Sequence, residues 1–522
     1  MSSGSNNGKD APLDIQSSTD VYAVHGADPE VQAYGMAKYS RSALSMRESL
    51  AEINEQKAEK FLNTFYFQYG HRSIADLAHL AFAIERLSIL AATVLVDEPR
   101  WDGQERSTRY QDFQKSGYYV PDFGSDYAAR SLYSGAVDRL FAEYRWFSEQ
   151  MFGYLRERTS KPAEMKQEAY ERTLRARAFD LSRYLLPLAA NTSLGQIVSA
   201  RTLETQVSRL LSHTHAEVRR LGELLRQAAQ QPAYNVSDTK LRDLMAQIEQ
   251  ESPETAERAR ELLLRDVRVA PTLVKYAEPN VYEIETRREL RAAAAELFHG
   301  ASIDEAPLVD MLDDEPLEIE LPATLLYQHS NHSYRQVRDV VTSLTDARRQ
   351  EIIDIGLRHR GRFDEVGRAF CCGQQFRFDI LMDIGGFRDM HRHRRCLQVV
   401  QEYTTVHGYD MPVEIAEAGL SARYEAAMSA TRQAVAKLAG PAPEAEERSQ
   451  YVIPLAFRKR TLFKMDLAEA IYISELRTGV AGHFSYRNVA FAMYEAVAKR
   501  YPGLAKYFRV TDVREPVDLL KR

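Results

Sequence analysis

The sequence predicts an α+β protein of two related halves, each a twisted sheet flanked by long helices, with a helical connector between them. Three observations lead to this expectation. The chain has 522 residues, about three times a typical domain of ~150 residues, so more than one compact unit is expected. A strand-like segment near the N-terminus is followed by long amphipathic helical patterns. Two short motifs recur in the same order along the chain, which indicates an internal duplication.

The first half is predicted to span residues 21–235. It follows a Ser-, Asn- and Gly-rich tail, residues 1–20, which we expect to be disordered. The segment VYAVHGA at 21–27 has the composition of a short strand. The helices expected in this half, from apolar residues at three- and four-residue spacing, cover residues 29–40, 50–68, 128–157 and 203–229.

Residues 236–320 are predicted to connect the halves. A polar, helix-prone stretch at 238–268 and an Ala-, Glu- and Arg-rich helix at 282–298 are expected to pack outside the two sheets. Acidic sequence punctuated by proline follows at 303–322 and is the best linker candidate, although an ordinary acidic surface loop has the same composition. The second half then spans residues 321–522.

The duplication is indicated by two pairs of motifs. The pentapeptide YLLPL at 184–188 recurs as YVIPL at 451–455, and each is followed by a helical pattern that contains a buried-looking histidine, His215 or His483. Upstream, QERST at 104–108 recurs as QEYTT at 401–405. Either match alone is weak, but both in the same order favour duplication.

Composition excludes several classes of protein. The 68 Lys and Arg residues against 74 Asp and Glu give a net charge of −6, which argues against a protein that mainly binds nucleic acid. No apolar run approaches the ~18 residues that a membrane helix needs. Three cysteines cannot form a disulfide framework in a chain of this length, which fits a reducing cytoplasm. We therefore expect a cytoplasmic protein with no nucleic-acid or membrane partner.

Two polar segments of the first half could bind anions. Residues 70–73, at the start of a helix, offer backbone N–H groups to an anion, although Ser73 could equally be a simple helix cap. Ser107 and Arg109 lie two residues apart in a loop, and a guanidinium can donate two hydrogen bonds to the oxygen atoms of a phosphate. The alternative for Glu105 and Arg109 is a local ion pair.

The order and spacing of these motifs resemble the flavin-dependent thymidylate synthases. The matching segments are GHRSIADLAH at 70–79, FAIE at 82–85 and QERSTRY at 104–110. In addition, Arg183 lies four residues before Pro187, and a segment ending in Arg201 begins twelve residues after that proline, as in the family. The resemblance covers nearly all of the first half.

The family's hallmark, R-H-R-x7-S, is altered differently in each half. Asp97, Glu98 and Pro99 stand in its place before Ser107, where two acids would repel a phosphate. The second half has Arg392, His393 and Arg394, but two residues further from the QEYTT motif than the family spacing. In that alignment, Val406 and His407 match Arg109 and Tyr110.

The two halves are therefore complementary, and we infer one surviving composite site. The resemblance implies that Arg477 polarises the uracil ring; its counterpart in the first half is Leu210, and a surface helix arginine is the alternative for Arg477. It also implies two further sets of residues. The substrate would be bound by Glu105, Ser107, Thr108, Arg109 and Arg183, and the flavin by Ser73, Arg201, His215, Arg392, His393 and Arg394. For His215, an ordinary buried histidine is the alternative.

The activity implied by the resemblance is methylation of dUMP at C5. FAD would be the cofactor, and NADPH and methylenetetrahydrofolate the co-substrates. Because the family builds each site at a tetramer interface, a homodimer of this duplicated chain would imitate that tetramer. No metal is expected, since arginines interleave the HxHxxC pattern at 391–396. The alternatives are a flavoenzyme of the same fold acting on another pyrimidine nucleotide, or a non-catalytic flavin- or nucleotide-binding protein.

Overall fold

The computed structural model describes residues 24, 26–38, 46–52, 58, 62, 72–275, 277–362, 364–440, 443–516, 518 and 520. Within them, α1 (Pro29–Lys38) agrees with the helix predicted at 29–40, whereas α2 (Met46–Glu52) shares only residues 50–52 with the helix predicted at 50–68. Most of the strand predicted at 21–27, and most of the helix predicted at 50–68, lie outside the described residues. None of the described helices combines the length and apolar character that a bilayer crossing requires.

The first half is built on an antiparallel sheet in which β3 (Asn191–Ser199) lies between β1 (His79–Ser88) and β2 (Asp102–Glu105). Side chains alternate between buried and exposed along β3, as expected for a sheet with one covered face. The helices of this half are α4 (Ile89–Val96), α5 (Tyr127–Arg158), α6 (Gln167–Ser182), α7 (Ala200–Leu211) and α8 (Ala216–Gln230), with short 3₁₀ turns at Arg72–Leu77 and Arg183–Leu185.

The second half repeats this plan with an added strand. Its sheet has the order β4 (Val309–Met311), β5 (Phe376–Asp383), β7 (Arg458–Met465) and β6 (Leu397–Val400), so that β5, β7 and β6 match β1, β3 and β2. Its helices are α12 (Leu317–Tyr327), α13 (Tyr334–Ser343), α14 (Asp346–Ile355), α15 (Ile384–Met390), α16 (Val413–Glu417), α17 (Ser421–Leu438), α18 (Pro443–Gln450), α19 (Leu467–Thr478), α20 (Phe484–Arg500) and α21 (Pro502–Ala505), with a 3₁₀ turn at Arg368–Phe370. Two tandem α+β units are thus confirmed.

The recurring pentapeptides pair with each other where the halves meet. Pro187 and Pro454 form an antiparallel bridge. Leu188 N donates to Ile453 O at 2.9 Å, and the equivalent Leu455 N donates to Leu186 O at 3.0 Å. Since each half supplies the same atoms, these bonds mark a local two-fold axis that relates the halves, and the apolar side chains around it belong to one core.

Smaller details also repeat around this axis. Tyr133 on α5 donates its hydroxyl proton to the carbonyl of Tyr119 at 2.6 Å, and Tyr424 on α17 does the same to Asp410 at 2.8 Å. Gly117 and Gly408 occupy equivalent turns with φ of 70° and 73°, a conformation that favours glycine. Such matched backbone and side-chain features support duplication independently of the pentapeptides.

The sheet register corrects the second repeat. Arg106 N donates to Ser193 O at 2.9 Å, and Gln401 N donates to Arg460 O at 3.2 Å. Ser193 and Arg460 each lie six residues after their proline, so Arg106 corresponds to Gln401. The alignment of QERST with QEYTT is therefore wrong by two residues. Ser107 corresponds to Glu402, and Arg109 to Thr404 rather than to Val406.

The corrected register also places the hallmark. Pro99 lies seven residues before Arg106, and Arg394 lies seven residues before Gln401. Residues 97–99 and 392–394 are therefore equivalent. The extra spacing inferred for the second half does not exist. That half has R-H-R-x7-E, with Glu402 in place of the serine.

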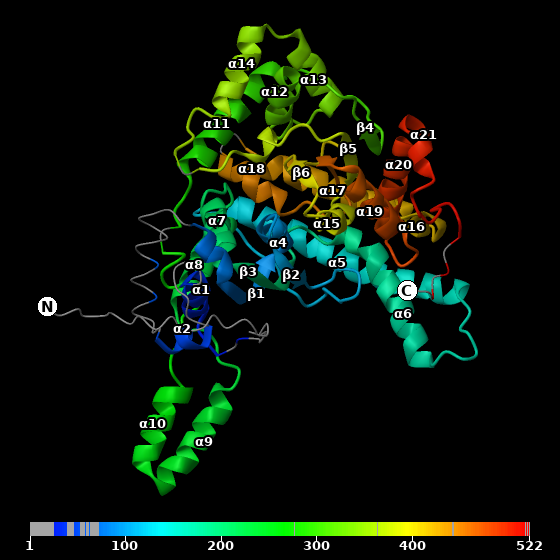
Figure 1. Ribbon diagram of the computed structural model, residues 1–522. Coiled ribbons are helices and arrows are strands. Elements are labelled where there is room, and N and C mark those ends of the chain that lie inside the picture. The colour runs from blue at the N-terminus through cyan, green and yellow to red at the C-terminus, as the bar shows by residue number, and fades with distance from the viewer. Residues whose placement is uncertain are drawn as a thin grey trace, which may run out of the picture.

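The connector is more varied than the sequence predicts. As Figure 1 shows, α9 (Asp238–Glu251) and α10 (Pro253–Leu263) form a hairpin that projects from the body, whereas α11 (Val281–Leu297) runs beside α12 and α14. The segment 303–322, predicted as a linker, instead contributes β4 to the second sheet and begins α12. The single helix predicted at 203–229 is broken between α7 and α8, where His215 becomes the N-cap of α8.

Candidate functional site

An ion network joins the two halves on one side of the local two-fold axis. The guanidinium of Arg109, from the loop after β2, binds both carboxylate oxygens of Asp180 on α6, with Nε–Oδ1 and Nη2–Oδ2 distances of 3.0 Å. Its Nη1 donates to the hydroxyl of Tyr486 on α20 at 2.9 Å. Arg109 and Asp180 are both buried and belong to the first half. The bonds that cross to the second half are those from Arg109 to the Tyr486 hydroxyl and, at 3.0 Å, to the carbonyl of Ala481.

Arg183 extends the network to α15 of the second half. Its Nη1 lies 3.3 Å from Asp389 Oδ2 and its Nε lies 3.5 Å from Asp180 Oδ1. Its side chain is 2 % exposed. An arginine buried to this degree requires compensating charge, which the two carboxylates supply.

Arg388, beside Asp389 on α15, contacts the loop after β2. Its Nη2 pairs with the carboxylate of Glu105, and its Nη1 donates to Thr108 Oγ1 at 3.3 Å. Glu105 therefore forms an ion pair across the interface and not, as the sequence alternative has it, with Arg109. Ser107 lies between these residues, and its hydroxyl accepts from Arg109 N at 3.2 Å.

Arg477 approaches the same network from α19. Its Nε donates to His393 Nε2 at 2.7 Å, and its guanidinium lies 5.5 Å from the centre of the Tyr486 ring. Arg477 and Arg392, the latter exposed, both act electrostatically to lower the pKa of Asp389. Arg394 lies over the ring of Trp101 at 4.4 Å. Side chains from both halves thus surround Asp389.

The charges in this network are strongly coupled. Burial opposes ionisation of Asp180, but His483, Arg183 and Arg109 hold its pKa well below its usual range. Burial also opposes ionisation of Asp389, and Arg183 and Arg109 are the leading influences that lower its pKa. Burial lowers the pKa of His483 to about 3, so the ring is neutral at pH 7 and the arginines carry the positive charge.

Several nitrogen atoms in the network have no hydrogen-bond partner among the described residues. Buried atoms without a hydrogen bond among the described residues include Arg183 Nη2, Arg388 Nε, Arg394 Nε and His483 Nε2. A buried polar group without a partner costs about 1–3 kcal/mol, and more when it is charged. Unpaired N–H groups on three arginines fit an anionic ligand, such as a nucleotide phosphate, better than a dry protein core.

The predicted site residues are only partly brought together. Glu105, Thr108, Arg109 and Arg183 join His393 and Arg477 in this composite site, with Ser107 and Arg392 beside them. Ser73 is exposed in a 3₁₀ turn, and Arg201 pairs with Asp76 at 3.1 Å and with Glu365 at 3.7 Å. His215 lies on the other side of the axis, where its ring contacts Tyr451, just as His483 contacts Tyr184.

Sequence reasoning missed Asp180, Arg388, Asp389 and Tyr486. Arg388 and Asp389 could have been found from their position, because they lie just before the R-H-R triplet, on a short helix that follows a strand. Asp180 and Tyr486 have no comparable signal, because their contacts to Arg109 join residues that are 71 and 377 apart in the sequence.

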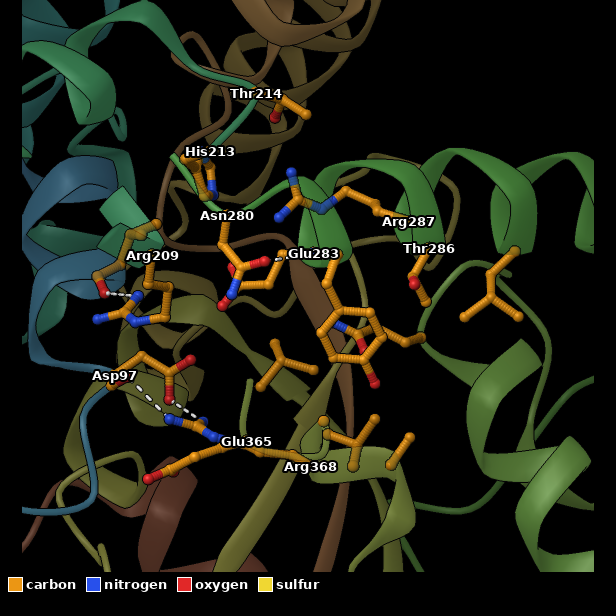
Figure 2. A pocket seen from close by; sticks show the side chains of 18 of the residues that line it. Asp97, Arg209, His213, Thr214, Asn280, Glu283, Thr286, Arg287, Glu365 and Arg368 are labelled. Atoms are coloured by element: carbon orange, nitrogen blue, oxygen red, sulfur yellow. Dashed lines mark hydrogen bonds and ion pairs between the residues drawn. The ribbon is translucent and has the colours of Figure 1, made fainter. Parts of the chain in front are cut away.

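The equivalent place on the other side of the axis is an open cavity of about 1090 Å³ (Figure 2). It is lined by α11 of the connector as well as by both halves. In Figure 2, Asp97 and Arg368 lie on one wall, and Arg287 and Thr286 come from α11. The two acids of the altered hallmark are neutralised here, since Asp97 pairs with Arg368 and Glu98 lies 3.8 Å from Arg209.

Fold and site together define a duplicated α+β protein whose halves share an arginine-rich composite site. The family model of the thymidylate synthase complementing protein matches two segments, residues 23–233 and 308–503. The chain therefore belongs to the thymidylate synthase complementing protein family. The predicted resemblance and the tandem arrangement are both confirmed.

Two relatives match nearly the whole chain, and a third matches part of it. A UPF0159 protein of Chlamydia pneumoniae is 28% identical over 96% of this chain and 93% of its own length. One from Thermoplasma acidophilum is 24% identical over 91% of this chain and 94% of its own. A flavin-dependent thymidylate synthase of Clostridium tetani is 25% identical over 34% of this chain and 67% of its own length.

Two solved structures are similar to part of this chain. Thymidylate Synthase X of Helicobacter pylori, determined with FAD and dUMP, is 16% identical over 38% of this chain and 88% of its own, with a TM-score of 0.26. The UMP/dUMP methylase PolB of Streptomyces cacaoi, bound with 5-Br dUMP, is 18% identical over 38% of this chain and 84% of its own, with a TM-score of 0.27.

Proposed function

We propose that the composite site binds dUMP and methylates it at C5 in an FAD-dependent reaction. The observation that carries this proposal is the convergence of Arg183 and Arg388 with Arg477 around Asp389, from both halves of the chain. Unpaired N–H groups on Arg183 and Arg388 suit the phosphate of a nucleotide. Family membership supports the same substrate class.

Arg477 is assigned the role of polarising the uracil ring. Its Nε is held by His393, while its Nη atoms form no hydrogen bond among the described residues. A guanidinium facing the N3 and O4 edge would stabilise the negative charge that makes C5 nucleophilic. Because Arg477 is placed by His393 and by the Tyr486 ring, its orientation is set before the substrate arrives.

Arg109 has a different role from the one expected. Its fork is occupied by Asp180 through two bonds of 3.0 Å, so it does not offer free donors to a phosphate. We assign the phosphate to Arg183 and Arg388 instead, with Ser107 and Thr108 nearby. Arg109 then acts as a positioning residue that holds the two halves in register.

FAD would be held by Arg392, His393 and Arg394. This assignment fits the unpartnered Nε of Arg394 and the planar surface that Trp101 provides beneath its guanidinium. When bound, FAD supplies the hydride chemistry, with NADPH as reductant and methylenetetrahydrofolate as carbon donor. The protein's part is to bind and orient the nucleotide and to hold charge near Arg477.

The test is the visible absorption spectrum of the purified full-length chain with FAD, followed by titration with dUMP. We expect flavin bands that dUMP perturbs. Arg392→Ala should weaken FAD binding by about 10-fold or more, the loss of one charge-assisted contact. Arg395→Ala is the matched control, because Arg395 is 67% exposed and pairs with Asp466 on the surface.

The substrate role is tested separately with Arg477→Ala, which should retain FAD but lose the response to dUMP. Rescue of a thymidine-requiring strain by the wild-type chain, and not by Arg477→Ala, would establish the reaction. The proposal would be overturned if no flavin absorbance stays with the protein after free FAD is removed and if dUMP also has no effect.

A further inference from the structure

The cavity of about 1090 Å³ is related to the composite site by the local two-fold axis but has lost that site's chemistry. Leu210 stands at the position of Arg477, and Gln450 at that of Arg183. Glu402 replaces Ser107, and its carboxylate is occupied by Arg291. Without a polarising arginine, this cavity cannot repeat the reaction assigned to its symmetry mate.

The cavity has gained a cation that neither repeat supplies. Arg287 lies on α11, in the stretch between the two segments that match the family model. Among the described residues it forms no ion pair, and its Nη1 donates only to the backbone carbonyl of Ser212 at 2.9 Å. Figure 2 shows its side chain extending from α11 toward His213 and Asn280.

Lys459 is a second basic side chain of the cavity lining, and it has no carboxylate partner among the described residues. Burial lowers its pKa to about 7, so about half of this amine is protonated at pH 7. It is 3% exposed, and its Nζ lies 3.3 Å from the centre of the Tyr403 ring. An aromatic face stabilises an ammonium group only in part, so this amine is available to an acidic group of a ligand.

His215 lies among these cations. It is 6% exposed, lines the cavity, and its Nε2 has no hydrogen-bond partner among the described residues. Burial, together with Arg291, Arg219, Lys459 and Arg287, lowers the pKa of its ring to about 4. The ring is therefore neutral at pH 7, and its unpaired nitrogen fits a polar group of a bound molecule.

Eight carboxylates also line the cavity, but most of them are already paired with arginines. These pairs include Asp97 with Arg368, Glu98 with Arg209, Glu278 with Arg226 and Glu365 with Arg201. Glu402 is paired with Arg291, and burial raises the pKa of Glu447. Glu283 lies one turn before Arg287 on α11 and influences it electrostatically without forming an ion pair. The buried Thr286 Oγ1, also on the cavity wall, has no partner among the described residues.

We propose that this cavity is a second ligand site, separate from the composite site, which binds a nucleotide-sized organic phosphate through Arg287, Lys459 and His215. A guanidinium, a lysine amine that protonates near pH 7, a neutral imidazole and a hydroxyl together match a phosphate group, with its several acceptor oxygens. The volume slightly exceeds the ~300–1,000 Å³ of common small-molecule pockets, which leaves room for the rest of a nucleotide.

The test is calorimetric titration of the full-length chain with inorganic pyrophosphate and with ATP, in the wild type and in Arg287→Ala. We expect binding that Arg287→Ala weakens about 10- to 100-fold, the loss of one charge-assisted interaction. Arg288→Ala is the matched control, because Arg288 is the next residue on α11 but is 65% exposed and pairs with Glu285. This control should bind like the wild type.

Arg477→Ala separates this site from the composite site. It should leave pyrophosphate and ATP binding unchanged, whatever becomes of dUMP binding. If Arg287→Ala is unstable by circular dichroism, Thr286→Val provides the second variant, with a smaller loss expected. Equal affinity of wild type and Arg287→Ala, tighter Arg287-dependent binding of citrate, or no binding by the wild type at about 10 mM ligand would overturn the proposal.

Discussion

Replacing Asp180 with asparagine should destabilise the fold, because Asp180 holds Arg109 and Arg183, which in turn contact Tyr486 and Asp389 of the second half. Asp180 is 4% exposed and receives two bonds of 3.0 Å from Arg109, while Arg183 Nε lies 3.5 Å away. Removing one partner of a buried ion pair typically costs about 3–5 kcal/mol, because the remaining charge stays buried. In Asp180→Asn, the carboxylate of Asp389 would be left as the shared counter-charge for the guanidinium groups of Arg109 and Arg183.

The expected change in melting temperature follows from chain length. An unfolding entropy of about 2.1 cal/mol/K per residue gives about 1.1 kcal/mol/K for 522 residues that unfold together. The loss therefore lowers the melting temperature by about 3–5 °C in differential scanning calorimetry at pH 7. Asp238→Asn is the matched control: it breaks an exposed pair with Arg242 and should shift the melting temperature by less than about 1 °C.

The same variant has a defined pH dependence. The pKa of Asp180 is depressed in the folded state, so its contribution is fully present above the ordinary carboxyl pKa of about 4. It is lost as the pH falls below that value toward the folded-state pKa. The difference between wild type and Asp180→Asn should therefore shrink at acid pH. A difference below about 1 °C at pH 7 would refute the view that this network stabilises the fold.

Three further predictions follow from the same contacts. Burial lowers the pKa of Lys459 to about 7, so between pH 7 and its ordinary value of about 10.4 the unfolded chain binds up to one more proton and stability rises with pH. Relative to Lys459→Met, the wild-type melting temperature should gain about 3 °C between pH 7 and 9.5, and a constant difference would contradict the assignment. Arg388→Gln should weaken dUMP binding about 10-fold in spectroscopic titration, whereas the exposed Arg395→Gln should not. Light scattering should report a homodimer of the 59.5 kDa chain; a monomer would contradict the expected imitation of a tetramer.

The sequence predicted the features that repeat locally. The pentapeptides at 184–188 and 451–455 revealed the duplication because each preserves a proline and its apolar neighbours, and the structure places them on the local axis. The spacing from Pro454 to Arg477 pointed to an arginine that the structure places beside the ion network, since only β7 and α19 lie between the proline and the end of that helix.

What the sequence could not supply were the register of β2 and β6 and the contacts between halves. The shared letters Q and E at 104 and 401 suggested an alignment that the backbone bonds of Arg106 and Gln401 contradict. A strand of four residues contains too little pattern to fix its own register. Similarly, the occupation of Arg109 by Asp180 depends on how α6 packs beside the loop after β2, which no local pattern encodes.

The difference between the two interface sites depends on the fusion of the halves. In a symmetrical assembly of identical subunits, a substitution that changes one site changes its symmetry mate as well. Here Arg183 and Gln450 occupy equivalent positions, as do Arg477 and Leu210, and each can be altered alone. Arg287 takes this further, because it comes from a connector that lies between the repeats and faces one site only. If the two sites are independent, the losses caused by Arg287→Ala and Arg477→Ala should each fall on a different ligand, and a double variant should show both losses without any additional effect.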